Sequence, residues 1–136
     1  MTPQSQTDVS HANSVDGSIE TFRVEVARSL AEQSLVGIAI LDSDRFVYAN
    51  PRFAQVFGYR PDAMLTIPAV ETIAYSSRLR VTQHVRECLA GEPGLGPVEF
   101  EGVKQDGAPV YVELCVSCME SGARRLAVFV IADVTS

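Results

Sequence analysis

Two cysteines, Cys115 and Cys118, have the Cys-x-x-Cys spacing found in redox pairs and in half of a structural zinc site. Position 119 is Met, so the motif is not the Cys-x-x-Cys-His sequence that attaches haem. A second pair that would complete a zinc site is missing. On an extended strand, residues three apart point to opposite faces, so we interpret both cysteines as packing or surface residues.

The other reactive side chains form no recognisable catalytic arrangement. Glu99 and Glu101 alternate along one predicted strand, which is more typical of a solvated edge than of an acid–base pair. None of the serines lies in a Gly-x-Ser-x-Gly turn. Gly91, Gly94 and Gly96 mark a loop that lacks the strand-before-helix context of a phosphate-binding motif. We therefore expect no enzymatic activity.

The composition restricts the class of protein. The chain has 136 residues, 46% hydrophobic and 21% charged, which predicts one globular domain with a real core. A net charge of −6 disfavours direct binding to nucleic acids and attachment to anionic membranes. No apolar run approaches the roughly 20 residues of a membrane helix, and the N-terminus does not resemble a signal peptide. Three cysteines, an odd number, indicate a cytoplasmic location.

The N-terminal part of the chain divides into two segments. Residues 1–17 are polar and have few large aliphatic side chains, so we expect a disordered tail. Residues 18–33 are predicted to form an amphipathic helix. Its apolar stripe consists of Ile19, Phe22, Val26 and Leu30.

Residues 34–135 are predicted to form one α+β domain. Strands are expected over 37–41, 45–49, 97–104, 108–118 and 124–133. Asn50 followed by Pro51 is typical of a helix start, because Asn caps the first turn and Pro suits the first helical position. A longer helix is expected over residues 76–90. The last three strands, joined by short turns, predict an antiparallel meander.

Several short segments of this domain resemble the PAS family of sensory domains, in the order and spacing found there. These segments are residues 37–42 (Gly-Ile-Ala-Ile-Leu-Asp), 48–53 (Tyr-Ala-Asn-Pro-Arg-Phe), 57–59 with Pro61, 104–107 (Lys-Gln-Asp-Gly) and 133–135 (Asp-Val-Thr). The resemblance implies a five-stranded antiparallel sheet with short helices on one face. We expect the N-terminal helix to cover the other face.

The last predicted strand is apolar on both of its faces. Val128 and Val130 share one face, whereas Phe129 and Ile131 share the other. We expect the two valines to face the core and the other pair to take part in dimer or helix packing. Burying one large apolar side chain is worth about 1.5–3 kcal/mol, so the outer face needs a cover. The N-terminal helix and a second copy of the chain are the two candidates.

The resemblance also raises the question of a cofactor. Flavin-binding light sensors of the family carry a cysteine after the Pro61 region, and residues 60–70 contain none, so we do not expect flavin. Haem-binding members use a histidine on the long helix. His84 lies on that predicted helix, but not at the family's position, so a partly exposed surface histidine is the favoured interpretation and haem the minor alternative.

An apolar cavity for a small organic ligand, between the sheet and the helices, is the remaining functional option. A pocket wall and a filled core have the same periodicity, so both alternatives stay open. Tyr48 is the expected polar group of the pocket. The candidate lining residues are Ile40, Tyr48, Phe53, Phe57, Leu65, Leu89, Val112, Leu114, Val128 and Val130.

The resemblance implies a regulatory input domain of a larger signalling protein. It would dimerise and pass a stimulus by repacking helices to an output domain, such as a kinase, a cyclic-nucleotide enzyme or a transcription regulator. Asp133 and Thr135 are the expected signal-transfer residues. The alternatives are a ligand-free interaction scaffold and, less favoured, a haem-based gas or redox sensor.

Overall fold

The computed structural model describes residues 26–27, 29–92 and 96–134. The chain divides into two units, residues 1–33 and residues 34–136.

The described part of the first unit is helical. Residues 26–27 and 29–32 form this helix, as expected for the later part of the amphipathic segment. The expected polar tail and two residues of the apolar stripe, Ile19 and Phe22, lie outside the described residues. The packing of this helix on the sheet therefore stays a prediction.

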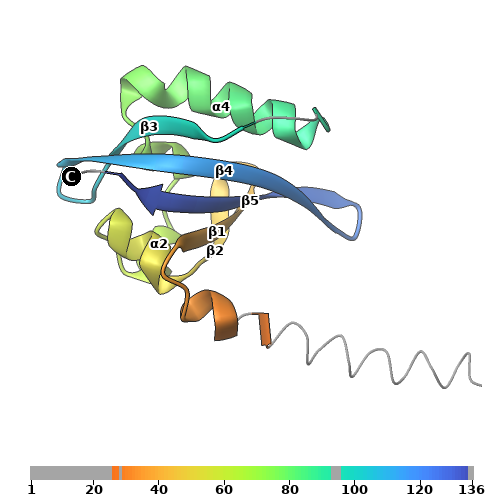
Figure 1. Ribbon diagram of the computed structural model, residues 1–136, viewed down its shortest axis with the longest axis horizontal. Coiled ribbons are helices and arrows are strands. Elements are labelled where there is room, and N and C mark those ends of the chain that lie inside the picture. Colours follow the sequence, from red (N-terminus) through yellow and green to blue (C-terminus); the bar gives the residue numbers. More distant parts are fainter. Residues whose placement is uncertain (1–25, 28, 93–95, 135–136) are drawn as a thin grey trace, which may run out of the picture. The chain divides into compact units, whose positions relative to one another are not determined.

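The second unit contains a five-stranded antiparallel sheet, which confirms the expected α+β class. Its strands are β1 (Gly37–Asp42), β2 (Arg45–Ala49), β3 (Val98–Val103), β4 (Pro109–Ser121) and β5 (Arg124–Asp133). Its helices are α2 (Pro51–Val56), α3 (Pro61–Met64), the 3-10 helix η1 (Ala69–Thr72) and α4 (Tyr75–Leu89). The strand order is β2-β1-β5-β4-β3, so the first and last strands of the chain pair at the centre (Figure 1).

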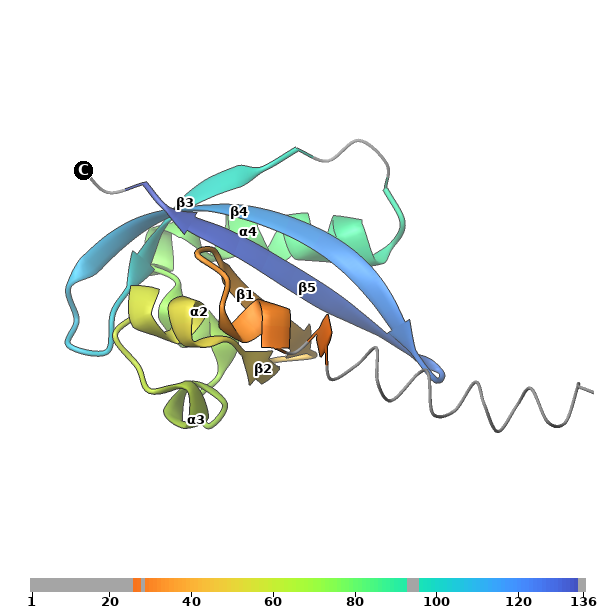
Figure 2. The same cartoon turned by 60° about the horizontal axis from the view of Figure 1, so that its bottom comes forward.

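The two longest strands, β4 and β5, run side by side as long curved ribbons (Figure 2). The β3–β4 hairpin turns at Gly107, whose φ of 91° belongs to the left-handed region that favours glycine. An Asp-Gly pair, here Asp106-Gly107, is typical of such tight hairpin turns. Helix α4 packs against β3, β4 and β5, while α2 packs against β1.

Asn50 fastens α2 to the first strand, and it is completely buried. Its Oδ1 accepts hydrogen bonds from the backbone N–H of Phe53 at 2.8 Å and of Ile38 at 2.9 Å. Its Nδ2 donates to the carbonyl oxygen of Val36 at 3.1 Å. The first of these bonds is the expected helix cap, with Pro51 at the first helical position. One side chain thus fixes both the start of α2 and the entry into β1.

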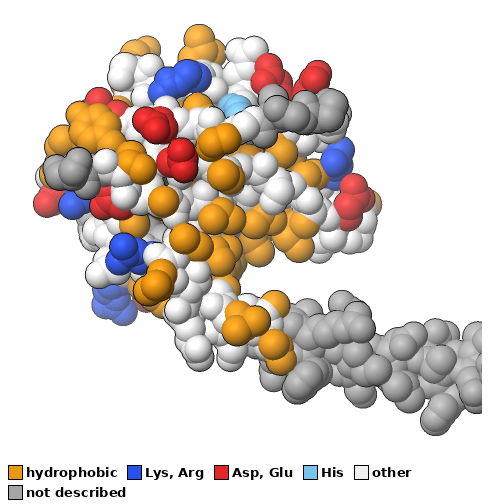
Figure 3. All heavy atoms as spheres, in the orientation of Figure 1, with side chains coloured by type: hydrophobic (Ala, Val, Ile, Leu, Met, Phe, Trp, Pro, Cys, Tyr) orange, Lys and Arg blue, Asp and Glu red, His pale blue; other side chains and the backbone are white. Residues whose placement is uncertain are grey.

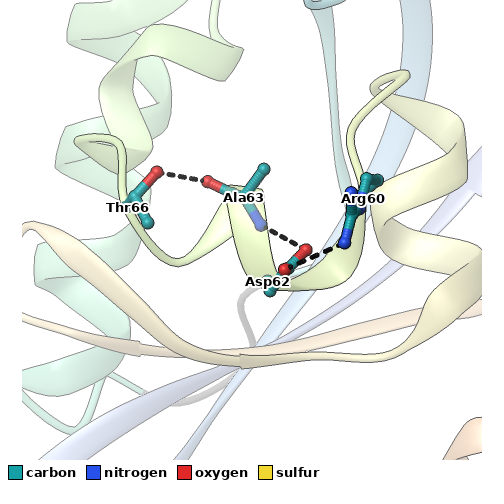
Figure 4. A network of polar contacts seen from close by, with 4 residues as sticks. All are labelled: Arg60, Asp62, Ala63 and Thr66. Atoms are coloured by element: carbon teal, nitrogen blue, oxygen red, sulfur yellow. Dashed lines mark hydrogen bonds and ion pairs between the residues drawn. The ribbon is translucent and has the colours of Figure 1, made fainter.

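Helix α3 is a single turn held by local polar contacts (Figure 4). Asp62 accepts a hydrogen bond from the backbone N–H of Ala63 at 2.9 Å and pairs with Arg60 at 3.3 Å. Thr66 Oγ1 donates to the carbonyl oxygen of Ala63 at 2.7 Å. The carboxylate lies in the first turn, where the positive end of the helix dipole favours it.

The structure reverses the expected faces of β5. Phe129 and Ile131 point into the core, where the Phe129 ring lies 5.7 Å from the ring of Phe46. Val128 and Val130 are half-buried and lie opposite Ile40 and Ile38 of β1, on the outer face. The strand is apolar on both faces, so its period could separate the two faces but could not show which one meets the helices.

Candidate functional site

A cleft of about 430 Å³ opens between α4 and the inner face of the sheet. Four segments that are far apart in the sequence contribute to it: the end of β1 with the following turn, η1, α4, and the first half of β5. Its lining consists of Leu41, Ser43, Asp44, Ala69, Val70, Ile73, Val81, Thr82, Val85, Arg86, Leu89, Arg125 and Phe129.

The floor of the cleft is apolar. Val81, Val85 and Leu89 follow one another at intervals of four residues, which places them on one face of α4. Phe129 of β5 and Ile73 after η1 also line the cleft. Cavities of 300–1,000 Å³ with mostly apolar walls are typical of small-molecule sites, and this cleft lies within that range.

The mouth of the cleft is polar, and Arg125 is its best-fixed group. Its Nη1 donates a hydrogen bond of 2.7 Å to the carbonyl oxygen of Leu89. Its Nε lies 3.3 Å from a carboxylate oxygen of Glu120. These contacts hold the guanidinium where the last turn of α4 meets the start of β5. Arg86, which lies in the last turn of α4, lines the same cleft.

The ten expected pocket residues lie in different parts of the domain and do not form one pocket. Only Leu89 lines the cleft. Phe53, Phe57, Val112 and Leu114 are fully buried in the filled core.

The other five expected pocket residues lie elsewhere on the domain. Leu65 caps the end of α3 and is exposed. Tyr48 pairs with Ile40 on the outer face, together with Val128 and Val130, so it offers no polar group to the cleft.

Sequence reasoning missed most of the real lining. A signal for three members was present, because Val81, Val85 and Leu89 form a row of aliphatic residues at helical spacing. No local signal identifies Arg125, since only the β1–β5 pairing and the packing of α4 bring it to the cleft.

His84 lies on another side of α4 from the cleft. It lines a shallow hollow of about 220 Å³ with Arg80, Gln83 and Glu87. Its imidazole is therefore not among the groups that face the apolar floor. Within the described residues, no cluster of His, Cys, Asp or Glu could hold a metal ion.

The cysteines occupy three different environments. Cys115 lies opposite Val130 on the outer face, whereas Cys118 lies opposite buried Ala127 on the inner face, so their side chains diverge as expected. Cys88 of α4 donates a hydrogen bond of 3.4 Å to the carbonyl oxygen of Val116. Burial raises the pKa of the Cys88 thiol; Cys118 raises it further and Arg125 lowers it.

The outer face of the sheet combines an apolar and an acidic area. The apolar area includes Ile38, Ile40, Val128 and Val130. Nearer the β3 edge, Glu99 and Glu113 lie directly opposite each other. Figure 3 shows hydrophobic side chains gathered over the strands, with acidic side chains beside them.

The first of the expected signal-transfer residues, Asp133, lies at the end of β5. Asp133 is the last residue of the strand and pairs in register with Val112. The next residue, Val134, donates its N–H to the carbonyl oxygen of Tyr111 at 2.9 Å. Thr135 lies outside the described residues.

A family model described as the PAS fold matches residues 31–136. Among solved structures, a PAS domain from a two-component sensor histidine kinase has a TM-score of 0.71 at 16% identity, over 84% of this chain and 98% of that chain. A domain of a sensory box sensor histidine kinase/response regulator from Geobacter sulfurreducens has a TM-score of 0.69 at 21% identity, over 83% and 96% of the two chains.

A third solved structure is an RNA-binding light-oxygen-voltage receptor, with a TM-score of 0.68 at 24% identity. The similarity covers 85% of this chain and 34% of the receptor. These likenesses establish the architecture. Comparison with curated proteins finds no match. In the part of the chain that the structure describes, no helix is long and apolar enough to cross a bilayer.

Proposed function

This chain belongs to the PAS fold family, and from that premise we propose that it is the sensory input domain of a longer signalling protein. In this proposal the domain itself is not catalytic. It binds a small organic ligand in the cleft and passes the change in packing to an output domain. The cleft carries the proposal, because its apolar floor and polar mouth are suited to a small molecule.

The path of the signal would run along β5. This strand supplies Phe129 and Arg125 to the cleft and ends at Asp133, where the chain continues towards Thr135. A ligand that displaces either side chain would bias the packing of the central strand. A ligand can shift a conformational equilibrium only by its difference in affinity for the two states, so direct contact with β5 favours this path.

We propose a homodimer as the signalling form, located in the cytoplasm. Because Phe129 and Ile131 lie in the core, the outer-face contacts of the proposed dimer are Val128 and Val130. Val26 and Leu30 of the N-terminal helix remain in the proposal. A histidine kinase is the favoured output domain, because the similar structures include PAS domains of sensor histidine kinases.

Flavin photochemistry and haem binding are not part of this proposal. Residues 60–70 contain no cysteine for a flavin adduct. His84 faces the shallow hollow with Arg80 and Gln83, away from the apolar floor. An absorption spectrum of the purified protein tests both exclusions, because a flavin or a haem band in the visible range would contradict the corresponding one.

The ligand-binding function is tested with the neutral dye Nile red and the variant Val85→Phe. The larger ring would occupy the floor of the cleft, so we expect dye affinity to fall at least about tenfold. Leu79→Phe is the matched control, because Leu79 lies on the exposed side of the same helix. Dye binding that is absent from the wild type, or equal in wild type and Val85→Phe, would overturn the proposal and favour a ligand-free scaffold.

The dimer is tested separately by sedimentation of the full chain. A charge in the apolar stripe should oppose association, so Leu30→Asp should shift the protein towards the monomer. A wild-type protein that is monomeric at all concentrations would exclude this part of the proposal.

A further inference from the structure

We propose that the ligand of the cleft is an amphipathic anion, with an apolar body on the α4 floor and a carboxylate or similar acidic group at Arg86 and Arg125. This inference rests on the proposed ligand-binding function and adds the chemical class of the ligand. It also changes the sequence expectation of a purely apolar molecule.

The apolar end of the cleft defines the body of the ligand. Val81 and Val85 of α4 face Phe129 of β5 across the cleft, and all three are at most 9% exposed. All three belong to the cluster of buried apolar side chains that forms the core. A hydrocarbon chain or an aromatic ring therefore suits this end, because it removes apolar surface from water.

Two guanidinium groups define the head of the ligand. Arg125 uses Nη1 for Leu89 and Nε for Glu120, and these contacts fix its plane at the mouth. Arg86 forms no ion pair with any residue that the structure describes. Guanidinium groups bind carboxylates through paired N–H donors, and a fixed guanidinium loses little entropy when it does so.

Negative charges at the mouth of the cleft weaken the attraction between the two arginine side chains and an anionic ligand. Asp44 lines the cleft, and Glu120 neutralises part of the charge of Arg125. The negative end of the α4 dipole also points towards the mouth. The charged groups that line the cleft, Arg86 and Arg125 against Asp44, leave one positive charge, which Glu120 outside the lining offsets in part, in a chain whose net charge is −6. This local excess would favour an anion over a neutral molecule of the same shape.

A neutral ligand would not use the charge of the two arginine side chains. It would cover the mouth and remove water from arginine N–H groups without replacing the lost hydrogen bonds. An acidic group replaces them with charge-assisted bonds. Because the mouth is open to solvent, we expect a preference of about fivefold to tenfold, which corresponds to about 1–1.4 kcal/mol.

The inference is tested by calorimetric titration of the full chain with octanoate and with octan-1-ol. Both probes have eight carbon atoms in an unbranched chain, and only octanoate carries a charge. We expect octanoate to bind at least about fivefold more tightly at low salt, and the preference to shrink as salt is added. Arg86→Gln should reduce the preference to less than about twofold. Asp44→Asn should increase octanoate affinity, because a repulsive charge is removed.

Arg60→Gln is the control, since Arg60 pairs with Asp62 on α3 and does not line the cleft. It should leave both affinities unchanged, and thermal melting should show that Arg86→Gln is folded. If octanoate and octan-1-ol bind equally well and Val85→Phe weakens both, the anion inference is overturned and the binding function is left intact. Failure of both probes and of Nile red would overturn the function itself.

Discussion

Arg125 Nη1 lies 2.7 Å from the carbonyl oxygen of Leu89, so a side chain of the central strand caps the last residue of helix α4. The final carbonyl groups of a helix have no partner within the helix. A cation at this end also interacts favourably with the helix dipole. The same side chain that lines the cleft therefore connects α4 to β5, and a ligand bound there, as proposed, would act on both elements.

The first prediction concerns this connection. Arg125→Ala should lower the free energy of unfolding by about 1 kcal/mol, since the bond is charge-assisted but partly exposed. Urea denaturation followed by circular dichroism measures the change. Arg60→Ala removes a highly exposed ion pair and should change stability by less than about 0.5 kcal/mol. Equal effects of the two substitutions would show that the Leu89 contact contributes nothing.

The second prediction concerns Asn50. Asn50→Ala should destabilise the domain by about 3 kcal/mol, because it removes the helix cap and leaves the N–H groups of Ile38 and Phe53 without their acceptor. Gln55→Ala on the exposed side of α2 is the control and should be neutral within about 0.5 kcal/mol. A cost below 1 kcal/mol for Asn50→Ala would contradict the role assigned to this side chain.

The local signals in the sequence predicted the elements well. Asn50 and Pro51 marked the start of α2, and Gly107 marked a turn, because each acts through backbone geometry that is nearly independent of tertiary context. The order of strands and helices then followed, and the PAS resemblance supplied the topology that local patterns do not contain.

The site was predicted less well, for a physical reason. Alternation along β5 separates Val128 from Phe129 but gives both faces the same apolar character, so only tertiary packing decides which one meets α4. The cleft also depends on a packing gap, and a filled core and a cleft wall use the same residue types. Phe53 and Leu114 were therefore expected in a pocket and are found in the filled core.

The third prediction concerns Glu99 and Glu113, which lie directly opposite each other on β3 and β4. Like charges in such a pair destabilise a sheet, whereas opposite charges contribute roughly 0.2–1 kcal/mol. Glu99→Lys should raise the melting temperature, and Glu99→Gln should give about half the gain. Added salt should reduce the difference between the variants. A lower melting temperature for Glu99→Lys than for the wild type would contradict the pairing.

The fourth prediction concerns pH and Cys88, whose thiol has a raised pKa because of burial and the nearby Cys118. In the unfolded chain a thiol ionises with a pKa of about 8.5. Above that pH the unfolded state loses its proton before the folded state does, so stability should fall as the pH rises towards the folded pKa. Below it both states hold the proton and the effect vanishes.

Urea denaturation at pH 7.5 and pH 9.5 measures this difference, and Cys88→Ala should make it smaller. The change in stability between the two pH values is compared, and not stability itself, because Cys88→Ala also removes the hydrogen bond to Val116. The loss of that bond lowers the free energy of unfolding at both pH values. Cys115→Ala, at an exposed position on the outer face, should keep the wild-type difference. The same burial predicts that iodoacetamide modifies Cys115 before Cys88 at pH 8, since only the thiolate reacts. An equal change in the free energy of unfolding between the two pH values in wild type and Cys88→Ala would show that burial of this thiol is not maintained in solution.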